Sequence, residues 1–592
     1  MDILTLAACA LLGACSQNGD AVNEMRLTQL SSNENRQHQH NDPEKNMESG
    51  FADSIAGNYL AARFAQNNHD WQKANRFYAN MLAKSQDKAK GLQQRAMVLA
   101  MGAGDHERAL SLARGLGNGK EDNNLPALFL ILDALQDTDY ERAATHLDRL
   151  SQDGIAKFIA PLLRGWTRTG LKESPGTDAL KANGVHRFHA VLMADYLDNS
   201  AYLETRTPKK ILESGISTDA LEHIGDIYVR HDKPETALVF YKHIQSKNPA
   251  RSGIDDKIRA LKSEKQAPAT EKLQPPVDNP AQGAARALFD IASLLFRDYS
   301  DDSARIFTQM ALYLKPDYTD ARLLLAHIAA RHERIDDALR LYSTVGGGNK
   351  QYTHARQRMS QLLAEKGQQE RAVTILETLV DEQDSINARI QIGDIYRRAE
   401  AFNKALTHYN RAAAMIKGEP GSEHWHLLYA RGMVHERLDN WSEAEKDLQK
   451  ALDHKPEHPY VLNYLGYSMA DRGKKLDKAL SMIRTAIKQR PEDGHIADSL
   501  GWVLYRMQKY AKAIPHLEEA VELEPYDAVI NDHLGDAYWR VGRRIEAQFQ
   551  WQRALENSDK SDLKDEIRAK LENGMTGEQD NPLKAAGYQK DK

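Results

Sequence analysis

The sequence predicts an all-α solenoid, a right-handed superhelix of stacked helix pairs. The pentapeptide IGDIY occurs twice, at residues 224–228 and 392–396, and the letters that follow each copy also match. Related copies recur through the chain at a period of about 34 residues. Within each copy, apolar residues fall at the i, i+3, i+4 and i+7 positions of amphipathic helices. One helix pair cannot bury its apolar face alone, so successive pairs are expected to stack around a concave surface.

Small residues recur at fixed places in each copy. In the first one, Gly225 is followed twelve residues later by Ala237 and sixteen residues later by Tyr241. We expect glycine and alanine to let the two helices of a pair cross closely. The large residue should then fill the space against the next pair. Pro249 ends the second helix, because proline cannot continue one.

This spacing resembles the tetratricopeptide repeat, and the resemblance covers most of residues 55–558. It is strongest toward the C-terminus. In one regular copy, the residues at the repeated positions are Gly501, Leu504, Ala513, Leu517, Ala520 and Pro525.

A composition break suggests how the repeats are grouped. Residues 264–283 hold four prolines and are predicted to be a linker. An N-terminal array of degenerate repeats is therefore expected at 51–263, and a C-terminal array of regular repeats at 284–558. Residues 559–592 read as a capping helix followed by a polar tail.

The first fifteen residues are predicted to be a signal peptide. Their apolar run ILTLAACALLGAC is too short to span a bilayer as a helix. It ends in LGAC, which resembles the lipobox of bacterial lipoproteins. The resemblance implies that Cys15 becomes the lipidated, palmitate-bearing N-terminus. Ser16 follows it in place of the aspartate that such lipoproteins use to avoid the outer membrane. The alternative is a cytoplasmic protein with an apolar first turn.

Residues 16–50 are rich in Asn, Gln, Ser and His and poor in large apolar residues. Such a segment buries too little surface to offset its ordering entropy, so we expect a disordered tether. A coil of this length would span about 30 Å. Its HQH sequence is interpreted as composition rather than as a metal site.

Bulk charge and cysteine content exclude several classes of function. The 592 residues carry 79 basic and 84 acidic side chains, a net charge of −5, which gives no reason to expect nucleic acid as a partner. The only cysteines are Cys9 and Cys15, so the body can hold neither a disulfide nor a cysteine-based zinc site.

Catalytic signatures were sought and not found. The sequence contains no G-x-x-x-x-G-K-[ST], no H-E-x-x-H and no G-x-S-x-G. The histidines of HWH at 424–426 are expected to lie on the repeat surface. We therefore predict a protein that is not an enzyme and has no catalytic residues, no cofactor and no bound metal.

A partner-binding groove is predicted on the concave face of the C-terminal repeats. In each first helix, fixed positions should face this surface, and here they are rich in aromatic residues and arginine, the types that dominate interface energetics. The alternative is that the two tryptophans of the set only pack between helices. The predicted groove residues are Tyr460, Asn463, Tyr467, Asp498, Trp502, Tyr505, Arg506, Asp532, Asp536, Trp539 and Arg540.

The C-terminal half resembles a more specific family. LNYLGYSMADRGKKLDKALSMI and ADSLGWVLYRMQKYAKAIPHLEEAVELEPYDAV look like the large tetratricopeptide outer-membrane lipoproteins of Gram-negative bacteria that bind a carboxyl-terminal processing protease. The resemblance implies a non-enzymatic periplasmic scaffold, anchored to the outer membrane by its lipid. Its partners would be that protease and the peptidoglycan hydrolases it degrades. One alternative is a factor for secretion or envelope-polysaccharide assembly; another is an enzyme with an unrecognised site.

Overall fold

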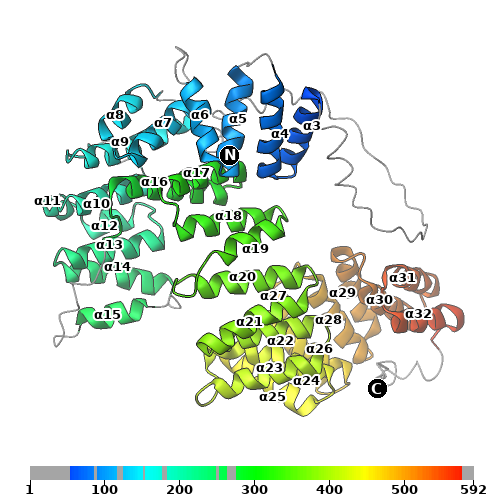
Figure 1. Cartoon of the computed structure of the whole chain (residues 1–592). Helices are drawn as coiled ribbons and strands as arrows, with labels where there is room; N and C mark the ends of the chain where they lie inside the picture. The colour runs from blue at the N-terminus through cyan, green and yellow to red at the C-terminus, as the bar shows by residue number, and fades with distance from the viewer. Residues whose placement is uncertain are drawn as a thin grey trace. The chain divides into compact units, whose positions relative to one another are not determined.

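A computed structural model describes most of the chain. The described residues are 54–85, 90–116, 124–150, 154–176, 180, 183–248, 253–262 and 275–575. Within these ranges about 30 α-helices pack in antiparallel pairs, which confirms the predicted all-α solenoid (Figure 1). No helix of the described ranges combines the length and the apolar composition needed to cross a bilayer. The predicted signal peptide with Cys15, the tether and the polar tail beyond residue 575 lie outside them.

The chain forms two compact units, residues 1–355 and 356–592, and the division falls inside α20 (Tyr352–Glu365). The helices of the first unit are α3 (Ile55–Asn67), α4 (Trp71–Lys84), α5 (Lys90–Ala103), α6 (His106–Leu116), α7 (Asn124–Gln136), α8 (Tyr140–Asp148), α9 (Gly154–Gly170), α10 (Gly184–Tyr196), α11 (Ser200–Glu204), α12 (Pro208–Leu212), α13 (Thr218–Arg230), α14 (Pro234–Lys247), α15 (Ile254–Lys262), α16 (Pro280–Arg297), α17 (Asp301–Leu314), α18 (Thr319–Arg331) and α19 (Ile335–Ser343).

The second unit continues the pairs to a single last helix. After α20 come α21 (Gln369–Gln383), α22 (Ile386–Arg398), α23 (Phe402–Met415), the 3₁₀ turn η3 (Ser422–His424), α24 (Trp425–Arg437), α25 (Trp441–His454), α26 (Pro459–Asp471), α27 (Leu476–Gln489), α28 (Gly494–Arg506), α29 (Tyr510–Leu523), α30 (Ala528–Arg540), α31 (Arg544–Asn557) and α32 (Ser561–Asn573).

The turn inside each pair has a common geometry. After α13, Asp232 adopts a φ of +55°, and the backbone N–H of Lys233 donates to the carbonyl of Tyr228 at 2.8 Å. Glu400 takes the same conformation after α22. This left-handed step satisfies carbonyls that the helix end would otherwise leave unpaired, and it reverses the chain for the second helix.

The glycine of each repeat lies where the paired helices touch. A Cβ added to Gly225 would come within 2.5 Å of the Tyr241 ring, and one added to Gly535 within 2.4 Å of Trp551. The prediction that the large residue of the second helix faces the next pair was therefore wrong in detail. Its side chain covers the glycine of its own pair, because only a missing Cβ leaves room for the ring.

The aspartate that follows the glycine explains the repeated IGDIY. In three repeats the aromatic residue over the glycine points its polar tip at this carboxylate. The pairs are Tyr241 and Asp226 at 2.6 Å, Tyr409 and Asp394 at 2.6 Å, and Trp551 and Asp536 at 3.0 Å. Where the second helix instead presents an aliphatic side chain, such as Leu448 or Leu517, the residue after the glycine is not aspartate.

Replacing Tyr409 with phenylalanine should therefore destabilise the second unit by about 1–2 kcal/mol. The buried ring would stay in place, but Asp394 would lose the hydroxyl that donates to it. Guanidinium unfolding followed by circular dichroism measures the change. Tyr396→Phe, at a partly exposed ring on the neighbouring helix, is the control and should change stability by less than about 0.5 kcal/mol. Equal losses in the two variants would contradict the pairing.

The first unit includes helices that we had assigned to the C-terminal array. Helix α16 packs against α9 and α10, and α17 packs against α5 and α7 (Figure 1). Long-range bonds accompany this packing, since the Arg334 guanidinium lies 2.9 Å from the Asp70 carboxylate. The compact units thus divide at residue 355 and not at the proline-rich segment, because the chain after that segment returns to the first helices.

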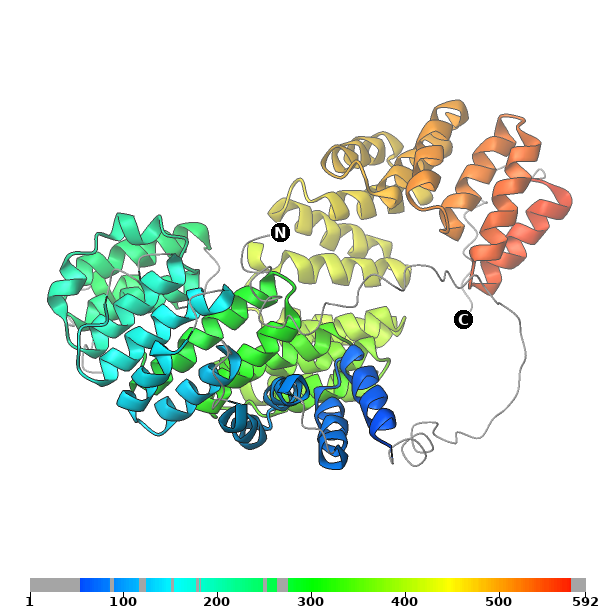
Figure 2. The ribbon, with the colours of Figure 1, turned by 90° about the horizontal axis from the view of Figure 1, so that it is seen from above.

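In the second unit, each pair stacks on the pair before it, from α22 and α23 to α30 and α31. Figure 2 shows the last pairs in a row, with α32 at the end. Helix α32 lies against α31 and closes the apolar end of the stack with Ile567. The predicted capping helix corresponds to α32.

Candidate functional site

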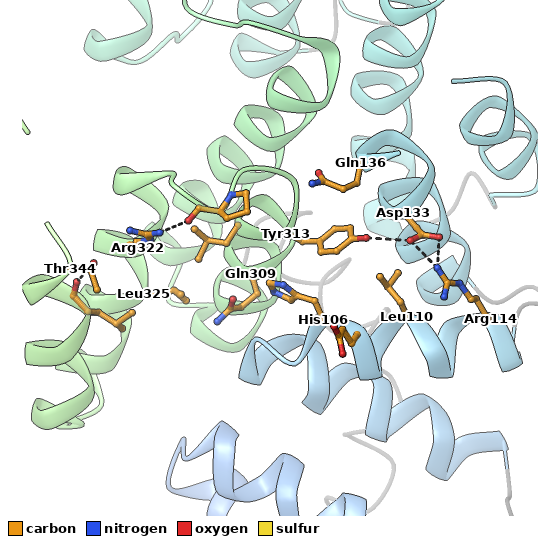
Figure 3. Close-up of a pocket in the computed structure, with 14 residues that line it drawn as sticks. His106, Leu110, Arg114, Asp133, Gln136, Gln309, Tyr313, Arg322, Leu325 and Thr344 are labelled. Atoms are coloured by element: carbon orange, nitrogen blue, oxygen red, sulfur yellow. Dashed lines mark hydrogen bonds and ion pairs between the residues drawn. The ribbon is translucent and has the colours of Figure 1, made fainter. Parts of the chain in front are cut away.

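A pocket of about 1020 Å³ lies within the first unit, between α6 and α7 on one wall and α17, α18 and α19 on the other. Figure 3 shows side chains from both walls directed toward the space between them. The walls are far apart in sequence, and they meet because α16 and α17 pack back on the first helices. Ligand-binding pockets typically have volumes of about 300–1,000 Å³, and the volume of this pocket is near the upper end of that range.

The α7 wall carries a closed polar cluster. Asp133 accepts two hydrogen bonds from the Arg114 guanidinium, at 2.9 and 3.1 Å, and a third from the Tyr313 hydroxyl at 3.2 Å (Figure 3). The hydrogen bond and charge of Asp133 raise the pKa of Arg114. The charges of Asp133 and Arg114 therefore neutralise each other, which leaves little electrostatic attraction for an ionic ligand.

His106, at the start of α6, is held as a neutral side chain. Burial lowers the pKa of this imidazole and outweighs a hydrogen bond with Gln309 and the charge of Asp105. Its ring meets the Tyr313 ring edge-on, with centroids 5.4 Å apart. Four leucines from both walls, Leu110, Leu312, Leu325 and Leu341, supply the apolar lining.

Sequence reasoning did not find this pocket. Its residues come from repeats that share no local motif, and α6 and α19 are about 200 residues apart in the chain. A repeat pattern reports contacts between neighbouring pairs, whereas this pocket depends on contacts between distant ones.

The predicted groove residues of the second unit lie together on α26, α28 and α30, but most are covered. Tyr460 is 44% exposed, whereas Asn463, Tyr467, Trp539 and Arg540 are half-buried. Asp498, Trp502, Tyr505, Arg506, Asp532 and Asp536 are buried. The neighbouring first helices and α32 pack over these positions, so their side chains contact the protein itself.

An aromatic stack forms the centre of this group. The Trp502 ring stacks on Tyr505 at 4.8 Å and on His533 at 3.9 Å between centroids. The Nδ1 atom of His533 lies 2.9 Å from the Asp498 carboxylate. Burial acts to lower the pKa of His533, but Asp498 outweighs it and raises the pKa. Arg540 Nε donates to the Tyr505 hydroxyl at 3.2 Å.

Helix α32 contributes a cation that the sequence analysis missed. Lys570 is 3% exposed, and its Nζ lies 2.7 Å from Asp532 and 3.0 Å from Asp536. Burial disfavours the ammonium, but the two carboxylates outweigh it and raise the pKa of Lys570 well above its usual range. No sequence signal links Lys570 to these carboxylates, because α32 lies outside the repeat pattern. In the described ranges, no three His, Cys, Asp or Glu side chains come together as metal ligands.

Comparisons with known proteins agree with the repeat geometry. Residues 384–457 and 429–493 match tetratricopeptide-repeat models, and residues 468–574 match a tetratricopeptide repeat-like domain. All three matches lie in the second unit. The fold is a tetratricopeptide-repeat solenoid, and residues 384–574 carry tetratricopeptide repeats by sequence. Proteins with such repeats typically bind other proteins and are typically not enzymes.

Individual relatives are distant. TPR repeat-containing protein PA4667 of Pseudomonas aeruginosa is 30% identical over 192 residues, and the match spans 32% of this chain and 32% of that relative. A tetratricopeptide repeat protein from Parabacteroides merdae has a TM-score of 0.35 at 15% identity, covering 44% of this chain and 99% of that one. The Cut9–Hcn1 complex of the APC/C has a TM-score of 0.37 at 15% identity, covering 90% and 98%.

Proposed function

We propose that the protein is a lipid-anchored periplasmic scaffold of the outer membrane, with Cys15 as the lipidated residue. It would hold a carboxyl-terminal processing protease together with its peptidoglycan-hydrolase substrates. The observation that carries the scaffold role is the tetratricopeptide-repeat solenoid in two compact units, the first of which carries a large pocket. The anchor and the partners come from the lipobox and from the family resemblance of the C-terminal half.

The mechanism is a raised effective concentration. A protease on one unit and a substrate on the other would meet as parts of one complex, so the second encounter becomes intramolecular. The scaffold itself needs no catalytic group for this effect. The polar segment before the first unit would give the complex reach from the membrane.

Degradation of a purified hydrolase by the purified protease tests the proposal. The rate should rise as the full chain is added and fall again at excess scaffold, because protease and substrate then occupy separate scaffold molecules. A flat response, or turnover of a cell-wall substrate by the chain alone, would contradict it. Crosslinking in cells with mass spectrometry tests the partners, and capture of secretion or polysaccharide-assembly proteins instead would favour that alternative. Palmitate labelling of the wild type and of Cys15→Ser tests the anchor.

A further inference from the structure

We propose that the pocket of the first unit binds an uncharged, extended peptide segment through one large apolar side chain. The inference rests on the proposed scaffold function and assigns one of its partners to a defined site. The pocket lies between repeats of the first unit that are distant in sequence.

The charges of the pocket favour a neutral occupant. Its acidic and basic lining residues are Glu107, Asp133, Arg114 and Arg322, which sum to no net charge, and His106 is held neutral. Asp133 is already engaged by Arg114 and Tyr313. Because the lining charges balance, a segment with a net charge would lose its hydration on entry without meeting a net opposite charge, so a charged occupant is disfavoured.

The uncharged groups of the pocket match the chemistry of a polypeptide. The amide of the exposed Gln136 combines donors with an acceptor, as a peptide backbone requires, whereas the buried Gln309 already bonds to His106. Between them the leucines form an apolar surface for one side chain. Leu110 and Leu325 are buried, whereas Leu312 and Leu341 are only half-buried and remain available to an occupant. Burial of a large apolar side chain is the usual source of affinity in such sites.

An occupant would touch both walls at once. Tyr313 and Gln309 come from α17 and Leu341 from α19, whereas Leu110 comes from α6 and Gln136 from α7. A bound peptide would therefore hold the distant repeats together, and it should raise the melting temperature of the first unit with the logarithm of the peptide concentration above its Kd.

An array of random dodecapeptides, incubated with the full chain, tests the site. Bound sequences should carry a large aliphatic or aromatic residue and no net charge. Their binding should change less than about twofold when the salt is raised to about 0.5 M. The double variant Leu312→Gln/Leu341→Gln should weaken binding roughly tenfold or more. Leu238→Gln, at a half-buried leucine of α14 outside the pocket, is the matched control and should leave binding unchanged.

A second measurement does not depend on how the double variant folds. With benzoylphenylalanine in place of the exposed lining residue Thr344, irradiation should join a selected peptide to the first unit. Any one of four results would overturn the assignment. These are selection of charged peptides, equal binding by the double and control variants, absence of bound peptides, and absence of this crosslink. If it fails while degradation still rises and falls with scaffold concentration, the pocket is refuted and the scaffold function stands.

Discussion

Replacing Lys570 with methionine is expected to destabilise the C-terminal end of the second unit by about 3–5 kcal/mol. The ammonium lies between Asp532 and Asp536, and the three side chains are nearly inaccessible to water. Methionine keeps most of the volume but leaves two carboxylates buried together without a cation. Removing one partner of a buried ion pair is strongly destabilising for this reason.

Hydrogen exchange locates the effect. Amides of α30, α31 and α32 should exchange faster in Lys570→Met, whereas those of the first unit should not change. The matched control is Lys564→Met. Lys564 is a less buried lysine of the same helix, α32, and its replacement should change amide exchange little. Unchanged exchange in Lys570→Met would show that the ion cluster does not hold the end of the stack.

A compensating variant separates lost charge balance from lost packing. Adding Asp532→Asn and Asp536→Asn to Lys570→Met removes all three charges, and most of the lost stability should return. The asparagine at 536 still offers a carbonyl to the Trp551 indole N–H, which donates to this side chain at 3.0 Å in the wild type. No recovery would mean that the lysine acts through packing of its stem.

The sequence was sufficient for the helix pairs because their determinants are local. Gly225 and Tyr241 are sixteen residues apart and meet inside one pair, so their spacing recurs wherever the pair recurs. The role of Asp226 could have been recognised in the same way, since aspartate follows the glycine in the three repeats that place an aromatic residue sixteen positions after it. A motif of glycine, aspartate and a distant tyrosine or tryptophan carries that information.

The pocket and the extent of the first unit could not be predicted in this way. The Arg305 guanidinium donates to the carbonyl of Gly102 at 2.7 Å across 203 residues, a contact that no repeat period encodes. The groove prediction took these helix faces to be open. Trp502 and Asp532 are covered because adjacent first helices, and then α32, pack on them.

Replacing Asp290 with alanine should destabilise the first unit by about 3 kcal/mol. Asp290 accepts from Arg286 at 3.0 Å and contacts His189 at 3.1 Å, and the Trp166 indole N–H donates to the other ring nitrogen of His189 at 3.1 Å. Because Nδ1 of His189 accepts the bond from Trp166, Nε2 carries the proton and donates to Asp290. This chain of polar groups joins α9, α10 and α16.

The charges within this chain are mutually dependent. Burial acts to raise the pKa of Asp290, but Arg286 and His189 outweigh it, so the carboxylate stays ionised. Without it, Arg286 would remain in a largely enclosed place without its directly bonded counter-ion. The expected loss is below the upper end for buried pairs, about 5 kcal/mol, because the Asp290 side chain keeps 16% of its exposure.

Hydrogen exchange and thermal unfolding together measure this loss. In Asp290→Ala, protection should fall in α9, α10 and α16 and stay unchanged in the second unit. Asp298→Ala, at the exposed end of α16, is the control and should shift stability by less than about 0.5 kcal/mol. The double variant Arg286→Met/Asp290→Leu should recover only part of the stability, because an apolar pair needs no counter-ion but the buried His189 N–H still lacks its acceptor. If Asp290→Ala instead leaves α16 fully protected, apolar packing such as Trp166 against Gly283 is sufficient to hold the returning helices.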